Sequence, residues 1–156
     1  MRLGVVLTEV SALVVIAYAL LAARPQQVAL LAMATASMVG SPALLALPVS
    51  RIVRDPRGSL LFYAWSTATT TIIAVAARID GGAGSPLVLL LFVTLTFAGL
   101  AYPPLGVALM GAVMVLAYLA VVAVAPPPAA LASLTASVLV LFCVMTWWAS
   151  RNQWDT

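Results

Sequence analysis

Long apolar runs separated by short polar or proline-containing stretches make up most of this sequence. A helix needs about 20 mostly apolar residues to cross the hydrocarbon core of a membrane. Six runs come close to this length, and their predicted bounds are 3–23, 27–49, 59–77, 86–101, 105–125 and 129–150. The pattern therefore predicts an all-α integral membrane protein, a bundle of six transmembrane helices that occupies residues 1–150.

Proline marks most of the boundaries between these runs. It has no amide donor and its ring clashes with the preceding helical turn, so it ends or kinks a helix. Pro25 follows the first run, Pro103 and Pro104 follow the fourth, and three prolines at 126–128 follow the fifth. Pro42 instead lies inside the second run, which predicts a kink at that point.

The composition supports a membrane location and excludes nucleic acid as a partner. Of 156 residues, 65% are hydrophobic and 7% are charged, whereas about a quarter of the residues in a soluble domain are charged. The basic residues are seven arginines, and they are spread among the predicted loops without forming a basic patch. The lipid bilayer is therefore the first predicted partner.

The distribution of arginines predicts the orientation of the chain. Six spans place both termini on one side, together with Arg2, Arg51, Arg54, Arg57 and Arg151, while Arg24 and Arg78 lie on the other. Cytoplasmic loops are the arginine-rich ones, so both termini are predicted to be cytoplasmic. The predicted membrane anchors at this face are Arg51, Arg54, Arg57, Trp147, Trp148 and Arg151.

Glu9 is the one acidic residue inside a predicted span. It lies about 9 Å into the first helix at a rise of 1.5 Å per residue, and ionisable residues at such depth usually face the bundle interior or water. The functional interpretation is a protonatable or ligand-sensing site. The alternative is a carboxylate near the interface that reaches toward Arg2, Arg51 or Arg54, and this second interpretation is favoured because Glu9 lies at a shallow depth. Glu9 also argues against the reading of the first run as a cleaved signal peptide.

Hydroxyl groups recur at helical spacing on the third predicted span. Tyr63, Ser66, Thr67 and Thr70 are at positions i, i+3, i+4 and i+7, which fall on one helix face. Such a stripe is a candidate for a polar interior or a sensing surface. Hydroxyl side chains in spans more often bond their own helix or a neighbouring one, and this second interpretation is favoured.

The loop after the third span predicts a tight hairpin on the exterior side. Its residues are Asp80, Gly81, Gly82, Ser85 and Pro86. Glycine allows the turn, proline suits the first position of a helix, and a serine before it caps free amides. Asp80 is expected to help position this loop.

Small residues recur every four positions on two other spans. The repeats are Ala32, Ala36 and Gly40, and Ala129, Ser133 and Ser137. Small residues let helices approach each other closely, so these repeats predict packing within the bundle or in a homodimer.

The chemical inventory predicts that this chain is not an enzyme and holds no cofactor or metal. It has no histidine and no lysine, and its single cysteine, Cys143, lies in an apolar run. One cysteine and four scattered acids do not make a closed zinc site. The glycine-rich phosphate-binding and dinucleotide-binding motifs are absent. No catalytic residue is predicted.

Residues 80–104 carry a resemblance to a known class of proteins. The stretch DGGAGSPLVLLLFVTLTFAGLAYPP combines an Asp-Gly-Gly-x-x-Ser-Pro-Leu turn, an apolar helix and a proline-containing turn. It resembles the multi-span N-terminal membrane sensor regions of bacterial diguanylate cyclases (GGDEF proteins), and is similar to those of sensor histidine kinases and class III adenylate cyclases. In this chain Ala83, not an acid, follows Gly81 and Gly82.

This resemblance implies a sensory input and anchoring module in the bacterial cytoplasmic (inner) membrane. Its partner would be a cytoplasmic output domain in cis or in trans, with residues 151–156 as the start of the linker. Two other hypotheses stay open, namely a small stand-alone transporter or channel subunit and a membrane scaffold. The transporter would use Glu9 and the hydroxyl stripe as a polar path.

Overall fold

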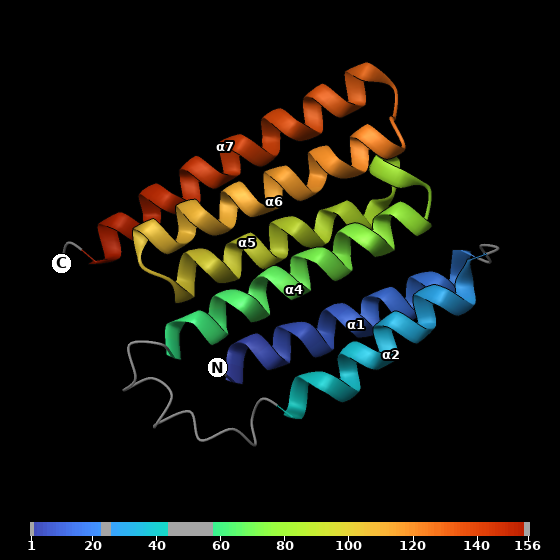
Figure 1. The fold of residues 1–156 in the computed structure, drawn as a ribbon, viewed down its shortest axis with the longest axis horizontal. Coiled ribbons are helices and arrows are strands. Elements are labelled where there is room, and N and C mark those ends of the chain that lie inside the picture. Colours follow the sequence, from blue (N-terminus) through green and yellow to red (C-terminus); the bar gives the residue numbers. More distant parts are fainter. Residues whose placement is uncertain (1, 23–25, 44–57, 155–156) are drawn as a thin grey trace. The chain divides into compact units, whose positions relative to one another are not determined.

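The computed structural model describes residues 2–22, 26–43 and 58–154. Over these residues the chain is helical and has no strand (Figure 1). The α-helices are α1 (Arg2–Ala22), α2 (Gln27–Ala43), α4 (Gly58–Ile79), α5 (Leu89–Ala101), α6 (Pro104–Val124) and α7 (Ala129–Trp154), with short 3₁₀ helices η2 (Gly82–Gly84) and η3 (Pro86–Val88). The prediction of an all-α chain is confirmed for the described residues.

Four of the described helices, α1, α4, α6 and α7, are long and apolar enough to cross a membrane. The helices α2 and α5 are apolar but shorter. The chain is therefore compatible with a membrane protein, while six crossings and cytoplasmic termini stay predictions.

Two predicted segments have different bounds or fall outside the description. The second run was expected to continue to residue 49, but α2 is described only as far as Ala43 and residues 44–57 are not described. Arg51, Arg54 and Arg57 lie in that part. At the other end, α7 continues past Ser150 to Trp154, so residues 151–154, expected to begin a linker, belong to the helix.

The described helices form two compact units, residues 1–62 and residues 63–156, which divide within α4. In the first unit, α1 and α2 pack together as a helical hairpin. Small side chains on α1, Ala12 and Ala19, and the α2 residues Leu30 and Ala34 are buried in it. Pro42 lies in the last described turn of α2, so the predicted kink would fall at the edge of the described residues.

The second unit contains α5, α6, α7 and α4 from Tyr63 onward, with neighbouring helices running in alternating directions (Figure 1). The helices α6 and α7 pack along each other, and α5 packs against both. Fully buried apolar side chains fill the space between the three helices: Leu91 and Leu95 of α5, Met110 and Met114 of α6, and Leu139 of α7.

Two glycines allow α7 to approach its neighbours closely. A Cβ atom on Gly111 of α6 would lie 3.0 Å from the sulfur of Cys143, and one on Gly99 of α5 would lie 3.2 Å from the Cβ of Thr146. Backbones that approach this closely gain van der Waals contact, which is the main attraction between helices in lipid. Residues 143 and 146 are one turn apart, so one face of α7 packs against both helices.

Candidate functional site

Polar side chains are buried among the apolar helices at a few places, and these are the candidate sites. One is the contact between Glu9 and Ser41 in the first unit. In the second unit they are a cluster around Tyr102, the turn at Asp80, and the buried hydroxyl of Tyr118. A buried polar group is costly unless it is hydrogen-bonded, so each place is informative about structure or function.

In the first unit, the Ser41 hydroxyl of α2 donates a hydrogen bond to a carboxylate oxygen of Glu9 on α1. Ser41 is fully buried, and Glu9 is half-buried. Among the described residues this is the only hydrogen bond that the Glu9 carboxylate makes. Of the alternative partners expected from the sequence, Arg51, Arg54 and the side chain of Arg2 lie outside the description.

Nearby hydroxyl groups on the same two helices behave differently. Thr8 Oγ1 donates to the carbonyl of Gly4 at 2.9 Å, and Ser37 Oγ donates to the carbonyl of Met33 at 3.0 Å. These are bonds within one helix, which hydroxyl side chains in apolar helices commonly make. Ser41 instead links the two helices through an acid.

The predicted hydroxyl stripe on α4 does not form one continuous lining. Ser66 and Thr70 are buried, Tyr63 is half-buried and Thr67 is exposed. Thr70 Oγ1 donates to the Ser66 carbonyl at 2.8 Å, a bond within the helix. Ser66 and Tyr102 hydroxyls share a hydrogen bond of 2.6 Å. These contacts agree with the interpretation of the hydroxyls as bonding groups.

The cluster around Tyr102, here named the Tyr102 joint, consists of Tyr63, Ser66, Tyr102, Gly106 and Ser150. The rings of Tyr63 and Tyr102 stack with centroids 4.9 Å apart. The Ser150 hydroxyl of α7 donates to the Tyr102 carbonyl at 3.0 Å. A Cβ atom on Gly106 would collide with the Tyr63 hydroxyl. The turn between α5 and α6 is thereby bonded to both α4 and α7.

The hydrogen bond between the hydroxyls of Tyr102 and Ser66 is insensitive to pH near neutrality. Tyr102 lies between the predicted fourth and fifth spans. Burial raises the pKa of the Tyr102 phenol above its ordinary value of 10.0; the hydrogen bond with Ser66 opposes this rise, and neighbouring Tyr63 adds to it. The phenol therefore stays protonated at neutral pH and keeps its bond with Ser66.

The Asp80 turn connects α4 to α5 through η2 and η3. Asp80 is 4% exposed, and its carboxylate accepts a hydrogen bond of 2.6 Å from Ser85. The Ser85 oxygen in turn accepts from the amide of Leu87 at 3.1 Å and caps η3. Gly81 and Gly82 have φ angles of 118° and 82°, a region that glycine enters without a steric penalty.

The end of α7 carries the predicted tryptophan and arginine residues. The Arg151 guanidinium lies over the Trp147 ring, 5.8 Å from its centroid, a cation–π geometry one helical turn apart. Trp148 is 61% exposed.

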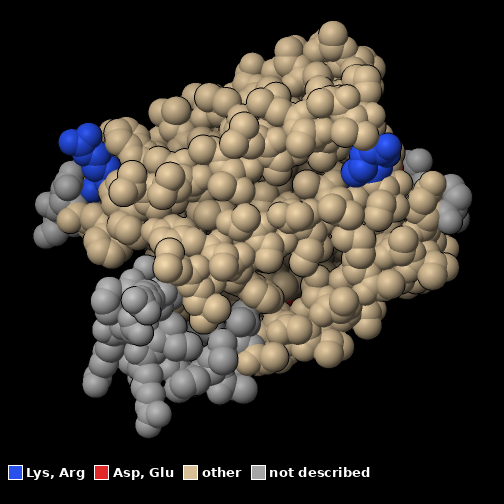
Figure 2. Space-filling view, viewed as in Figure 1, with Lys and Arg blue, Asp and Glu red and all other residues tan. Residues whose placement is uncertain are grey.

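The face drawn in Figure 2 is largely uncharged, with basic side chains at two separate places near the ends of the view.

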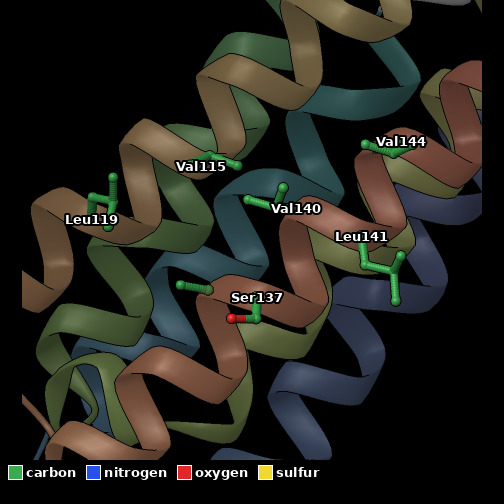
Figure 3. Close-up of a pocket in the computed structure, with 7 residues that line it drawn as sticks. Val115, Leu119, Ser137, Val140, Leu141 and Val144 are labelled. Atoms are coloured by element: carbon green, nitrogen blue, oxygen red, sulfur yellow. The ribbon is translucent and has the colours of Figure 1, made fainter.

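A groove lies between α6 and α7 (Figure 3). Its lining residues are Val115, Leu119, Ala136, Ser137, Val140, Leu141 and Val144. Ser137 supplies the only polar side chain of this lining. The predicted small residues Ala129 and Ser133, like Ser137, are exposed, so this repeat is not used for packing within the described unit.

Tyr118 of α6 is 1% exposed, and its hydroxyl has no hydrogen-bond partner among the described residues. A buried hydroxyl without a partner destabilises a fold by about 1–3 kcal/mol. We therefore expect Tyr118→Phe to leave the free energy of unfolding unchanged or to raise it by up to about 3 kcal/mol. Denaturant unfolding of the detergent-solubilised protein measures this, and a clear loss of stability would indicate a bound water or ligand.

Four buried polar residues were not anticipated from the sequence: Ser41, Tyr102, Tyr118 and Ser150. The sequence feature that could have pointed to Ser41 was its position next to Pro42 inside a predicted span. For Tyr102 it was an aromatic residue directly before two prolines. The hydrogen-bond partners of Ser41, Tyr102 and Ser150 are 32 to 48 residues away along the chain, and spacing alone does not identify such pairs.

No group of three or more metal-ligating side chains occurs among the described residues. Comparison with known protein families, curated proteins and solved structures finds no match for this chain. Function is therefore inferred from the residues and the contacts described above.

Proposed function

We propose that this chain is the membrane-embedded input and anchoring module of a bacterial signal-transduction protein. It would couple a membrane or exterior signal to a cytoplasmic output domain, for which a diguanylate cyclase is the leading candidate. The proposal builds on the resemblance of residues 80–104 to such sensor regions and on the geometry of α7.

The observation that carries this proposal is the length and continuity of α7. The helix has 26 residues, which at 1.5 Å per residue is about 39 Å. The hydrocarbon core is about 30 Å thick, so a helix of this length that crosses with little tilt would extend beyond it. A continuous helix that leaves the membrane is suited to transmit rotation or translation to whatever follows it.

The Tyr102 joint supplies a connection from other helices to α7. Ser66 of α4 and Ser150 of α7 both bond Tyr102, one through its hydroxyl and one through its carbonyl. A displacement of α4 would therefore move Tyr102 and, through it, Ser150, which lies four residues before the end of α7. Signalling requires two packings with different affinities for the signal, and this joint is where we expect them to differ.

The first test is the intact mass of the native protein in its own membrane. A mass far above 16.2 kDa would support the proposal, and the additional domain would identify the output. A mass of 16.2 kDa would remove an output domain in cis and favour the alternative functions.

The second test concerns transmission through α7 in a chain followed by its output domain. We expect alanine insertions of one to four residues after Arg151 to change the output periodically, because each residue rotates the helix by about 100°. An insertion of seven residues at the same place, which turns the helix by about two full turns and restores its phase, is the control. Equal output from all insertions within α7 would contradict the proposal, provided that the protein level in the membrane is unchanged.

A transporter or channel subunit is the second candidate, and the contact between Glu9 and Ser41 favours it. Carboxylates inside apolar helix pairs often mark ion or proton pathways. Flux of protons or substrate into proteoliposomes, abolished by Glu9→Gln, would support this function. Thr67 and Thr70 are weaker candidates for the path, because Thr67 is exposed and Thr70 bonds its own helix.

A further inference from the structure

The contact between Glu9 and Ser41 lies in a helix pair with few other ionisable groups. The helix α2 that packs against Glu9 contains no titratable side chain, and α1 itself contains only Arg2, Glu9 and Tyr18. Tyr18 is nine residues farther along α1, about 13 Å away. The side chain of Arg2 and the charged residues at 24 and 51–57 lie outside the description. Among the described side chains of this hairpin, only Tyr18 is titratable besides Glu9, and Ser41 is the hydrogen-bond partner of the Glu9 carboxylate.

Pro42 changes the hydrogen bonding available to its neighbour Ser41. In an α-helix the carbonyl of residue 38 accepts from the amide of residue 42. Residue 42 is a proline inside α2, and proline has no amide hydrogen. The Met38 carbonyl thus lacks its usual α-helical donor. Met38 lies three residues before Ser41, and a serine hydroxyl can donate to the carbonyl of the residue three positions before it.

Two other hydroxyls of this protein show that geometry. Ser133 Oγ donates to the carbonyl of Ala130 at 3.1 Å, and Thr146 Oγ1 donates to the carbonyl of Cys143 at 3.0 Å. In both cases the acceptor is three residues before the donor. The Ser41 hydroxyl accordingly has two acceptors, the Glu9 carboxylate that it contacts and the carbonyl of Met38.

We propose that Glu9, Ser41 and the Met38 carbonyl form a proton-binding site within the α1–α2 hairpin. In the proton-free state, Ser41 donates to the ionised Glu9 carboxylate. When a proton from water binds a Glu9 oxygen, the new acid O–H donates to Ser41 Oγ. The Ser41 hydrogen then turns to the Met38 carbonyl. Every donor keeps an acceptor in both states, and a proton is the only species gained or lost.

This inference does not depend on the proposed signalling function. A sensor would use such a site to respond to pH or to a proton gradient, and a transporter would use it to carry protons. The proposal concerns only binding, so its test needs no output domain and no substrate.

The test uses the full chain in lipid nanodiscs and infrared difference spectra between a reference pH at which carboxylates are ionised and a series of lower pH values. Glu9 is the only glutamate of the chain, because the other three acids are aspartates. Selective ¹³C labelling of glutamate therefore marks the C=O band of Glu9 alone. We expect this labelled band of a protonated carboxyl to appear on acidification and to be absent in Glu9→Gln.

Variants of two serines on the same helix test the role of Ser41. In Ser41→Ala the band is expected to move to higher wavenumber, because the protonated acid loses its hydrogen-bond partner. Ser41→Thr keeps the hydroxyl and should restore the wild-type position. Ser37→Ala is the matched control, since Ser37 bonds the Met33 carbonyl of its own helix, and it should leave the band unchanged.

Two results would overturn the inference. The first is a wild-type spectrum in which the labelled band does not change with pH, which needs no variant to interpret. The second is a band that has the same position in wild type, Ser41→Ala and Ser37→Ala, which would remove Ser41 from the site.

Discussion

Replacing Tyr102 by alanine is expected to lower the free energy of unfolding by about 3–5 kcal/mol, the usual cost of deleting a buried aromatic ring. Tyr102 is 8% exposed, and its ring stacks on Tyr63 and makes a T-shaped contact with Phe97 at a centroid distance of 6.3 Å. The substitution removes both ring contacts and leaves the buried hydroxyl of Ser66 without its partner.

Tyr102→Phe separates the two contributions, because it keeps the ring and removes only the hydroxyl. Loss of the hydrogen bond with Ser66 is expected to cost about 1–3 kcal/mol. The bond from Ser150 is to the Tyr102 carbonyl and is available in both variants. Denaturant unfolding in detergent measures the series. A loss below about 1 kcal/mol for Tyr102→Ala, where surface substitutions usually fall, would show that the joint does not hold the helices together.

Local chemistry in the sequence predicted several structural features well. The Ser85-Pro86 pair predicted a capped helix start, and Ser85 caps η3 in the structure. The prolines at 103–104 and 126–128 predicted the starts of α6 and α7 to within about one residue. Each of these features depends on a backbone donor or a fixed φ angle within a few residues, so the neighbouring sequence is sufficient to specify it.

The end of α7 was not predicted, for an equally local reason. Residues 151–153 are polar, which predicts the end of the apolar span at Ser150. The stretch Arg-Asn-Gln-Trp contains neither glycine nor proline, so nothing in it ends a helix. Hydropathy indicates where the apolar environment stops, whereas the helix stops where the backbone chemistry changes.

Helix packing was harder to predict than helix location. The small-residue repeats at Ala32–Gly40 and Ala129–Ser137 contain mainly exposed positions, while Gly99 and Gly111 make the close approaches to α7. In an alanine-rich chain, small residues at a spacing of four occur on several faces. Their spacing does not indicate which face meets a neighbour, because that depends on the partner helix.

Of the two residues in the Glu9–Ser41 contact, one could be recognised from the sequence and the other could not. Glu9 stood out in the sequence because a carboxylate in an apolar run is unusual. Its partner Ser41 did not stand out, because serine is common in spans and the pair is separated by 32 residues. The sequence alone was thus sufficient to identify Glu9. The structure was needed to identify Ser41 as the residue that hydrogen-bonds to it.

The largest expected effect in the Asp80 turn is that of Gly82→Ala. Gly82 has a φ angle of 82°, where an alanine is strained by about 1–2 kcal/mol. Its Cβ atom would also lie 2.5 Å from the Cβ of Ala125 and 2.9 Å from the Ala125 carbonyl oxygen. Inserting a methyl group into a packed site costs about 1–3 kcal/mol, so we expect a total loss of about 2–5 kcal/mol.

Two neighbouring glycines provide matched controls for this prediction. Gly81→Ala has the backbone strain alone, since its φ angle is 118° and no atom lies near its Cβ position. Gly84→Ala has neither the strain nor a neighbour and should be close to wild type. Thermal and denaturant unfolding should therefore rank stability as Gly84→Ala, then Gly81→Ala, then Gly82→Ala. Equal stability of the Gly81 and Gly82 variants would argue against packing of the turn on the end of α6, because the contact with Ala125 is present at Gly82 and absent at Gly81.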